Sequence, residues 1–145
     1  MRTVLPILFL GVLLGGCALA PAAPQHLCIH RHAEEEQDIG YCAALRSGDM
    51  LYLSGTVGTE PMPEAVKAGY ARLQKTLEDQ GLSYADVVKE TVYTTRLDEF
   101  IQAADLRKPF YRGSYPAATW IGVQRLFEAE DVLEIELTAK YPPGK

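Results

Sequence analysis

Hydrophobic and polar positions alternate along residues 133–141 with a period of two. Leu133 and Ile135 fall on one side of the chain, while Glu134 and Glu136 fall on the other. Successive side chains of a strand point to opposite faces of its sheet, so the pattern predicts a half-buried strand. Five earlier segments rich in β-branched, aromatic or aliphatic residues predict further strands. These segments are residues 27–32, 41–46, 50–54, 86–95 and 119–126.

Two helices are predicted between these strands. The first starts near Pro63 and ends before Gly81, because apolar residues repeat at intervals of four, three and four. Its apolar face consists of Val66, Tyr70, Leu73 and Leu77. The second is predicted to start at Asp98, as its capping residue, and to end or kink at Pro109. The charged run at residues 34–38 is predicted to be a solvated loop.

The order of elements is therefore βββαβαββ, which predicts an α+β sandwich with two helices on one face of a mixed sheet. The other face must then meet water or a second subunit. Trp120, in register with Gly122 and Gln124, is expected to lie on that face. A face that is neither wholly polar nor wholly apolar is suited to a subunit interface.

The first 16 residues have the pattern of a secretory signal peptide. Arg2 precedes a short apolar run that is too short for a stable transmembrane helix, and small residues then precede Cys17. The end of this segment resembles a bacterial lipobox, in which Cys17 would be lipidated and become the new N-terminus. Residues 17–25, rich in Ala and Pro, are predicted to be a tether, and residues 26–145 a single folded domain.

Composition narrows the classes of function. The 145 residues are 48% hydrophobic and 23% charged, as in ordinary globular chains, with a net charge of −5. Removal of 16 residues, including Arg2, would leave 129 residues with a charge of −6. An acidic chain offers no excess of cations to neutralise phosphates, so nucleic acid is not an expected partner. The expected location is the bacterial cell envelope, as a periplasmic lipoprotein whose only membrane contact is the lipid.

Short motifs spread in order over most of residues 40–139 resemble the Rid family of reactive-intermediate imine deaminases, also called YjgF-like proteins. The motifs are Gly40-Tyr41, 46–49 (RSGD), 51–55 (LYLSG), 81–83 (GLS), 86–89 (DVVK), 91–93 (TVY), 115–117 (YPA) and 133–136 (LEIE). Each motif is short, but their order and spacing together carry the resemblance. It implies a chorismate-mutase-like fold and a homotrimer that binds a small molecule in clefts between subunits.

The resemblance also implies roles for individual residues. Glu134 matches a glutamate that positions or activates the attacking water, while Tyr41 and Ser54 match residues that line the pocket. No cofactor or metal is expected for this chemistry. Alternation places Glu134 and Glu136 on one face of the strand, where each could raise the pKa of the other.

The chain departs from the family where an arginine would bind the substrate carboxylate. Ala118 stands at that position, Thr119 follows it, and Trp120 stands where a small Cys is common. Losing a bidentate charged contact of roughly 1.5–3 kcal/mol weakens carboxylate binding about tenfold or more, which disfavours amino-acid-derived imines as substrates. The sequence leaves open which other arginine, if any, replaces it. The candidates are Arg46, Arg107, Arg112 and Arg125.

Cysteine and histidine residues near the start of the domain suggest two alternatives. Cys28 and Cys42 lie on predicted neighbouring strands and could form a disulfide in an oxidising envelope. Cys28, His30 and His32 fall on one strand face and could instead present metal ligands, although their spacing matches no standard zinc site. No metal site is expected.

Three functions follow from these observations. The first hypothesis is a Rid-like homotrimer that hydrolyses an imine- or enamine-like small molecule, with Glu134 acting on water. The second is a non-catalytic ligand-binding or holdase-like lipoprotein, in which Ala118 and Trp120 make the cleft apolar. The third, an endoribonuclease, is disfavoured by the acidic charge.

Overall fold

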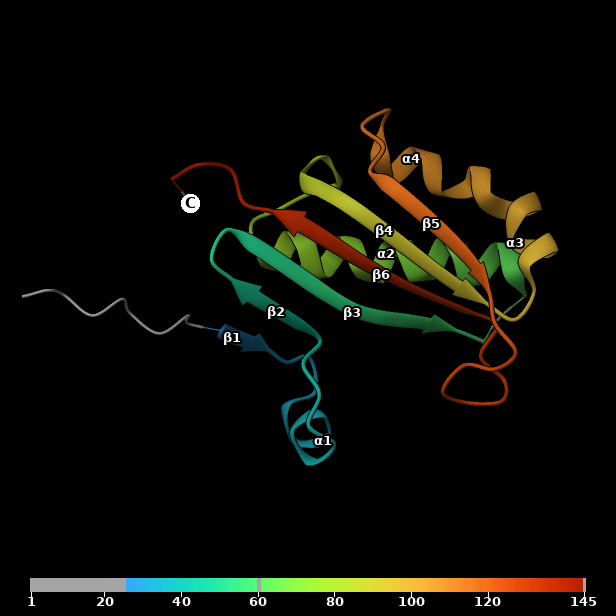
Figure 1. The fold of residues 1–145 in the computed structure, drawn as a ribbon, viewed down its shortest axis with the longest axis horizontal. Coiled ribbons are helices and arrows are strands. Elements are labelled where there is room, and N and C mark those ends of the chain that lie inside the picture. The colour runs from blue at the N-terminus through green and yellow to red at the C-terminus, as the bar shows by residue number, and fades with distance from the viewer. Residues whose placement is uncertain (1–25, 60, 145) are drawn as a thin grey trace, which may run out of the picture.

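A mixed sheet with helices packed on one face forms the framework of the domain (Figure 1). The computed structural model describes residues 26–59 and 61–144, and the predicted signal peptide, Cys17 and the tether at residues 17–25 lie outside them. In spatial order the strands are β1-β2-β3-β6-β4-β5. Their bounds are β1 His26–Ile29, β2 Ala44–Ser47, β3 Met50–Gly58, β4 Val87–Thr94, β5 Ala117–Gly122 and β6 Leu133–Lys140.

The helices follow the predicted order, with two additions, α1 and the short η1. Their bounds are α1 Ala33–Asp38, α2 Met62–Asp79, η1 Tyr84–Asp86, α3 Leu97–Ala103, η2 Ala104–Arg107 and α4 Lys108–Tyr111. α2 crosses behind the sheet, and α3 to α4 lie beside it near β5 (Figure 1). Strands β4 and β5 run parallel, so the chain must cross over between them, and α3 to α4 form that crossover. The predicted fold class is confirmed.

The two clearest sequence patterns form the core. The apolar face predicted for α2 is fully buried, with Val66, Tyr70, Leu73 and Leu77 each 0% exposed. Gly81, at a φ of +67°, ends the helix, and the Leu82 N–H donates to the Leu77 carbonyl, as in a Schellman motif. In β6 the residues predicted to point inward are buried, while Glu134 and Glu136 on the other face are partly exposed.

The second helix differs from its prediction at both ends. It begins at Leu97 after Arg96, and Asp98 lies within its first turn instead of capping it. Pro109 does not end the helical segment, because it lies in the first turn of α4, where a missing N–H breaks no hydrogen bond. The strand predicted at 41–46 starts only at Ala44, and the one predicted at 119–126 is shifted to β5.

The charged run at residues 34–38 is helix α1, so the prediction of a solvated loop is wrong. Glu36 turns inward and is buried. Its carboxylate accepts hydrogen bonds from the backbone N–H groups of Arg31 and His32 and contacts His30 Nδ1 at 3.0 Å. Burial raises the pKa of Glu36, but these hydrogen bonds outweigh it and lower the pKa below its ordinary value. One acidic residue of the run thus fastens α1 to the end of β1.

Trp120 lies on the helix side of β5, so its predicted place on the opposite face is also wrong. Its ring meets Phe100 of α3 edge to face, with 5.2 Å between centroids, and packs against the core. We call the sheet face left uncovered by the helices the open face. It carries Tyr52, Val57, Thr91, Tyr93, Thr119, Ile121, Glu134, Glu136 and Thr138.

Candidate functional site

Glu134 lies on the open face above an irregularity in β3. The register between β3 and β6 shifts between Leu53 and Thr56, and Gly55 lies within that shift. A Cβ atom at position 55 would come 1.8 Å from Glu134 Oε1, so the carboxylate occupies the space that a side chain there would fill. Glycine at position 55 is therefore what allows Glu134 to lie against the backbone of β3.

Tyr41 and Ser54 hold the neighbouring backbone. The Tyr41 hydroxyl donates to the Gly55 carbonyl at 3.3 Å, which brings its ring to the same end of β3 as Glu134. The Ser54 hydroxyl donates to the Cys42 carbonyl at 2.7 Å. Of the predicted residues, Tyr41 and Glu134 thus converge on Gly55, whereas Ser54 uses its hydroxyl to fix the segment that carries Tyr41.

The electrostatic surroundings keep Glu134 less acidic than a free glutamate. Burial raises its pKa most, and the nearby charges of Asp131 and Glu136 raise it further. Glu136 accepts a hydrogen bond from the Tyr93 hydroxyl at 3.2 Å. No residue in the described parts of the chain donates a hydrogen bond to Glu134. Its carboxylate oxygens are therefore available to contact water.

A second carboxylate, which the sequence analysis did not single out, lies on the helix side of β4. Glu90 is 0% exposed. Its Oε2 accepts hydrogen bonds from the Tyr70 hydroxyl at 2.7 Å and the Tyr111 hydroxyl at 2.6 Å. Its Oε1 accepts one from Trp120 Nε1 at 3.0 Å. Glu90 alternates with Val92 and Thr94 on the buried side of β4, and a carboxylate at such a position is the signal that could have revealed it.

Arg107 completes the Glu90 cluster. Its Nη1 lies 3.6 Å from Glu90 Oε1, and its guanidinium lies 5.0 Å from the centre of the Trp120 ring, with Tyr111 and Tyr115 slightly farther. Ala118 is paired with Glu90 across β4 and β5. The position from which the family's arginine would extend is therefore beside an internal ion pair, and Arg107 is committed to that pair.

The predicted binding residues on β5 are divided between the two faces. Thr119 lies on the open face, where its hydroxyl accepts a hydrogen bond from Lys89 Nζ. Ala118 and Trp120 lie on the helix side with Glu90. The structure thus brings Tyr41 and Glu134 together and separates Ala118 and Trp120 from them.

Cys28 and Cys42 form a disulfide, with 5.4 Å between their Cα atoms. Cys42 precedes β2 instead of lying on it, and it follows Tyr41 directly. The alternative in which Cys28 joins His30 and His32 as a metal ligand is not supported. Within the described residues, no group of three or more His, Cys, Asp or Glu side chains is placed to hold a metal ion. None of the described helices is long and apolar enough to span a bilayer.

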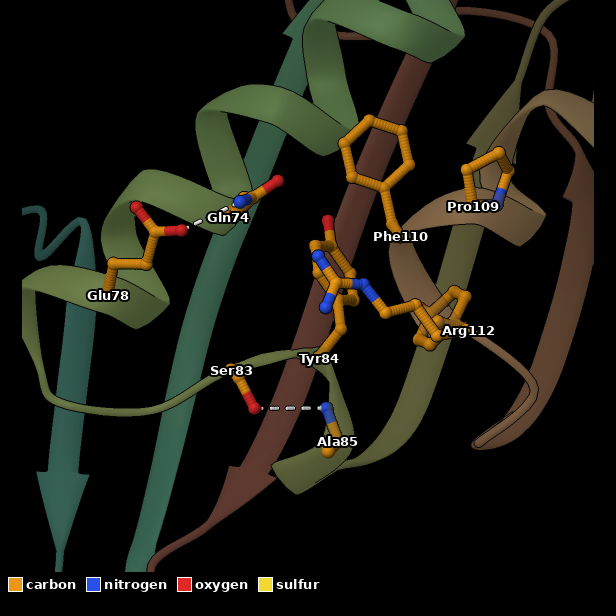
Figure 2. A pocket seen from close by; sticks show the side chains of 9 residues that line it. Gln74, Glu78, Ser83, Tyr84, Ala85, Pro109, Phe110 and Arg112 are labelled. Carbon is orange, nitrogen blue, oxygen red and sulfur yellow. Dashed lines mark hydrogen bonds between the residues drawn. The ribbon is translucent and has the colours of Figure 1, made fainter.

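A further cavity lies on the helix side, and Tyr111, which donates to Glu90, forms part of its lining. It has a volume of about 520 Å³ and lies between α2, η1 and α4 (Figure 2). Figure 2 shows Arg112 extending towards Tyr84 from the side of the cavity that also carries Phe110 and Pro109, with Gln74 and Glu78 of α2 on the other side. Ser83 at its rim accepts a hydrogen bond from the Ala85 N–H and is thereby engaged in capping η1. Of the candidate arginines, Arg112 lines this cavity, whereas Tyr41, Ser54 and Glu134 do not.

Comparison with known proteins identifies relatives over most of the domain. The family described as Endoribonuclease L-PSP matches residues 34–141. A 2-iminobutanoate/2-iminopropanoate deaminase from Dermatophagoides farinae is 28% identical over 115 residues, covering 69% of this chain and 90% of the relative. The RutC family protein YjgH from Escherichia coli is 32% identical over 113 residues, covering 70% and 83%.

Solved structures agree on the fold. Rv2704 from Mycobacterium tuberculosis, a member of the YjgF/YER057c/UK114 family, superposes with a TM-score of 0.72 at 22% identity, covering 80% of this chain and 99% of the other. NMB1025 from Neisseria meningitidis, a member of the YjgF family, gives a TM-score of 0.64 at 21% identity, covering 72% and 90%. At these sequence identities the similarity to solved structures supports the fold and nothing further.

Proposed function

The chain belongs to the Endoribonuclease L-PSP family, which includes imine deaminases among its relatives, and on that premise we propose that it hydrolyses an imine- or enamine-like small molecule at Glu134. The observation that supports this most is the geometry around Gly55. A half-buried carboxylate with a raised pKa lies over a glycine backbone, beside Tyr41, with no hydrogen-bond donor from the described residues.

The reaction requires a single group that accepts a proton and then gives it back. Water adds its oxygen to the carbon of the C=N bond, and the electron pair of that bond moves to nitrogen. Glu134 accepts the proton that water loses and passes it to that nitrogen, which gives a carbinolamine. The carbinolamine hydroxyl then gives its proton to the same carboxylate as its C–O bond becomes C=O, and the carboxyl group delivers this proton to the nitrogen, which leaves as ammonia. A carboxyl group whose pKa is raised holds a proton more readily than a free glutamate, which suits both directions of transfer.

We further propose that the working unit is a homotrimer whose clefts adjoin the open face. That face carries large side chains which the single chain leaves exposed, among them Tyr52 at 46%, Val57 at 38% and Ile121 at 37%. Apolar surface of this kind is stabilised when a second copy covers it. Sedimentation of the domain tests this proposal, and a monomer at micromolar concentration would contradict it.

Hydrolysis of 2-imino acids generated in solution, followed as ammonia release, tests the catalytic proposal. We expect the Glu134→Gln variant to lose at least about a hundredfold in rate, the usual contribution of a general acid–base group. Glu136→Gln is the matched control, because Glu136 lies on the same face of β6 but is held by Tyr93. Equal rates in wild type and Glu134→Gln would exclude this role for Glu134.

The alternative of a non-catalytic protein with an apolar cleft receives less support. It relied on Trp120 and Ala118 lining the cleft, but Trp120 packs on the helix side and donates to Glu90. An endoribonuclease receives no support from the open face, because Glu134 and Glu136 would repel phosphates there.

Export and lipidation are proposed for the N-terminal segment on its sequence pattern alone. We propose that residues 1–16 are removed, that Cys17 carries the lipid, and that residues 17–25 link it to the domain in the bacterial envelope. Mass spectrometry of the mature protein is expected to find a lipidated Cys17 as its first residue. An unmodified N-terminus at any other position would contradict the proposal.

A further inference from the structure

The second half of β3 has an open edge beside two arginines. β2 pairs with β3 only over residues 50–53, so within the described part of the chain residues 55–58 have no neighbouring strand on that side (Figure 1). Such an edge presents backbone N–H and C=O groups that no strand satisfies. A cavity of about 350 Å³ lies here, lined by Arg31, Arg72 and residues 55–59.

The two arginines are held by neutral partners. Arg31 Nη2 donates to the Thr76 hydroxyl at 3.1 Å, and Arg72 Nη2 donates to the Val57 carbonyl. A guanidinium has five N–H groups, so each arginine retains donors for another acceptor. In the described parts of the chain, neither has a carboxylate within ion-pair distance, in contrast to Arg107.

The wall of this cavity also contains polar groups of β3. Because the N–H and C=O of one residue point to the same side of an antiparallel strand, the Val57 N–H faces the edge together with the carbonyl that Arg72 binds. The Thr56 hydroxyl is buried and has no hydrogen-bond partner among the described residues. Two guanidinium groups with neighbouring N–H and O–H donors are the chemistry that binds a carboxylate.

The cavity adjoins the proposed catalytic group through Gly55. Gly55 lines the cavity, and the same residue is the one over which the Glu134 carboxylate lies. We propose that Arg31 and Arg72 form a subsite that binds the carboxylate of an anionic substrate and presents its reactive carbon to Glu134. This inference rests on the proposed hydrolysis at Glu134. It places the positive charge that Ala118 cannot provide at the edge of β3 instead of on β5.

Binding of a stable keto acid tests the subsite without requiring turnover. We would titrate the full chain calorimetrically with 2-oxobutanoate, and with its uncharged amide as the comparison ligand. Arg31→Gln and Arg72→Gln are each expected to weaken 2-oxobutanoate binding about tenfold or more, as loss of a charge-assisted contact does. Arg125→Gln is the matched control, because Arg125 is exposed and does not line the cavity. The amide should bind the wild-type protein as weakly as 2-oxobutanoate binds the double variant that carries both Arg31→Gln and Arg72→Gln.

If the double variant bound 2-oxobutanoate with wild-type affinity, the proposed subsite would be excluded. It would also be excluded if the wild-type protein bound 2-oxobutanoate and its amide equally well, or bound neither. Arg31→Lys and Arg72→Lys, which keep the charge, should bind better than the glutamine variants and guard against a folding defect. Glu134→Gln should still bind 2-oxobutanoate. Arginine-dependent binding without any turnover would exclude the hydrolysis and leave the subsite standing. Turnover with an unchanged KM in the glutamine variants would exclude the subsite and leave the hydrolysis standing.

Discussion

Glu90 and Glu134 lie on neighbouring strands of one sheet, but they point to opposite faces and meet opposite surroundings. Glu90 is fully buried and accepts three hydrogen bonds, and Arg107 balances its charge. Glu134 is partly exposed and lies beside two further acidic residues. A buried charge persists only when it is paired and hydrogen-bonded, whereas a carboxylate that acts on water must keep its oxygens available. The difference separates a structural carboxylate from a chemical one.

The largest change in stability is expected from a substitution at Glu90. Glu90→Ala leaves the Arg107 charge and three donors without their acceptor, so we expect the free energy of unfolding to fall by about 3–5 kcal/mol. Denaturant unfolding followed by the fluorescence of Trp120 measures it. Glu136→Ala, on the open face, is the control and should cost far less. A loss below about 1 kcal/mol for Glu90→Ala would show that the cluster is not structural.

A smaller loss should follow from removing one donor. Tyr111→Phe deletes the hydroxyl that lies 2.6 Å from Glu90 Oε2, which should lower the free energy of unfolding by about 1.5–3 kcal/mol. Tyr115→Phe is the matched control, because its ring is exposed and makes only ring contacts in the cluster. Equal losses in the two variants would mean that the hydrogen bond to Glu90 contributes little.

A substitution at Glu134 should raise the free energy of unfolding, whereas the substitutions at Glu90 and Tyr111 lower it. Folding raises its pKa, so the ionised carboxylate disfavours the folded state at neutral pH, and this penalty disappears as pH falls through the raised pKa. Glu134→Gln should therefore stabilise the domain at about pH 7 by less than about 1 kcal/mol, with the difference vanishing near pH 4. Unfolding curves across this range test it, and a variant less stable than wild type at pH 7 would contradict the assignment.

The smallest change in stability is expected at Gly55, where activity should nevertheless fall strongly. In Gly55→Ala the new methyl group would lie 1.8 Å from Glu134 Oε1 and 2.7 Å from its Cγ, so the whole Glu134 side chain would have to change rotamer and move away. Stability should change by less than about 0.5 kcal/mol, because alanine loses less chain entropy in a strand than glycine. Ammonia release should fall as far as in Glu134→Gln. A fully active Gly55→Ala protein would show that the contact does not matter.

The periodic patterns predicted the framework because each one reports burial on one face of an element. The four apolar residues of α2 and the alternation of β6 are buried as predicted. Local charge misled the prediction at residues 34–38, since a run of acidic side chains gives no sign that Glu36 will meet the backbone N–H groups of Arg31 and His32. That contact depends on where β1 ends relative to α1.

The candidate site was predictable only in part. Glu134 and Tyr41 could be named from the family resemblance, and the structure brings both to Gly55. The face of Trp120 was mistaken because alternation along a strand does not say which side meets the helices. The pairing of Trp120 with the buried Val92 of β4 decides it. The pairing of Arg107 with Glu90 and the approach of Arg31 to Arg72 join residues far apart in sequence, and no local pattern records them.

The disulfide between Cys28 and Cys42 turns α1 and its flanking residues into a closed ring of chain. A protease that cuts the backbone once within α1 would leave both fragments covalently joined, so the nicked protein would keep its N-terminal segment. Should Cys17 carry the proposed lipid, the domain would stay attached to the membrane after such a cut, and only reduction of the disulfide would release it.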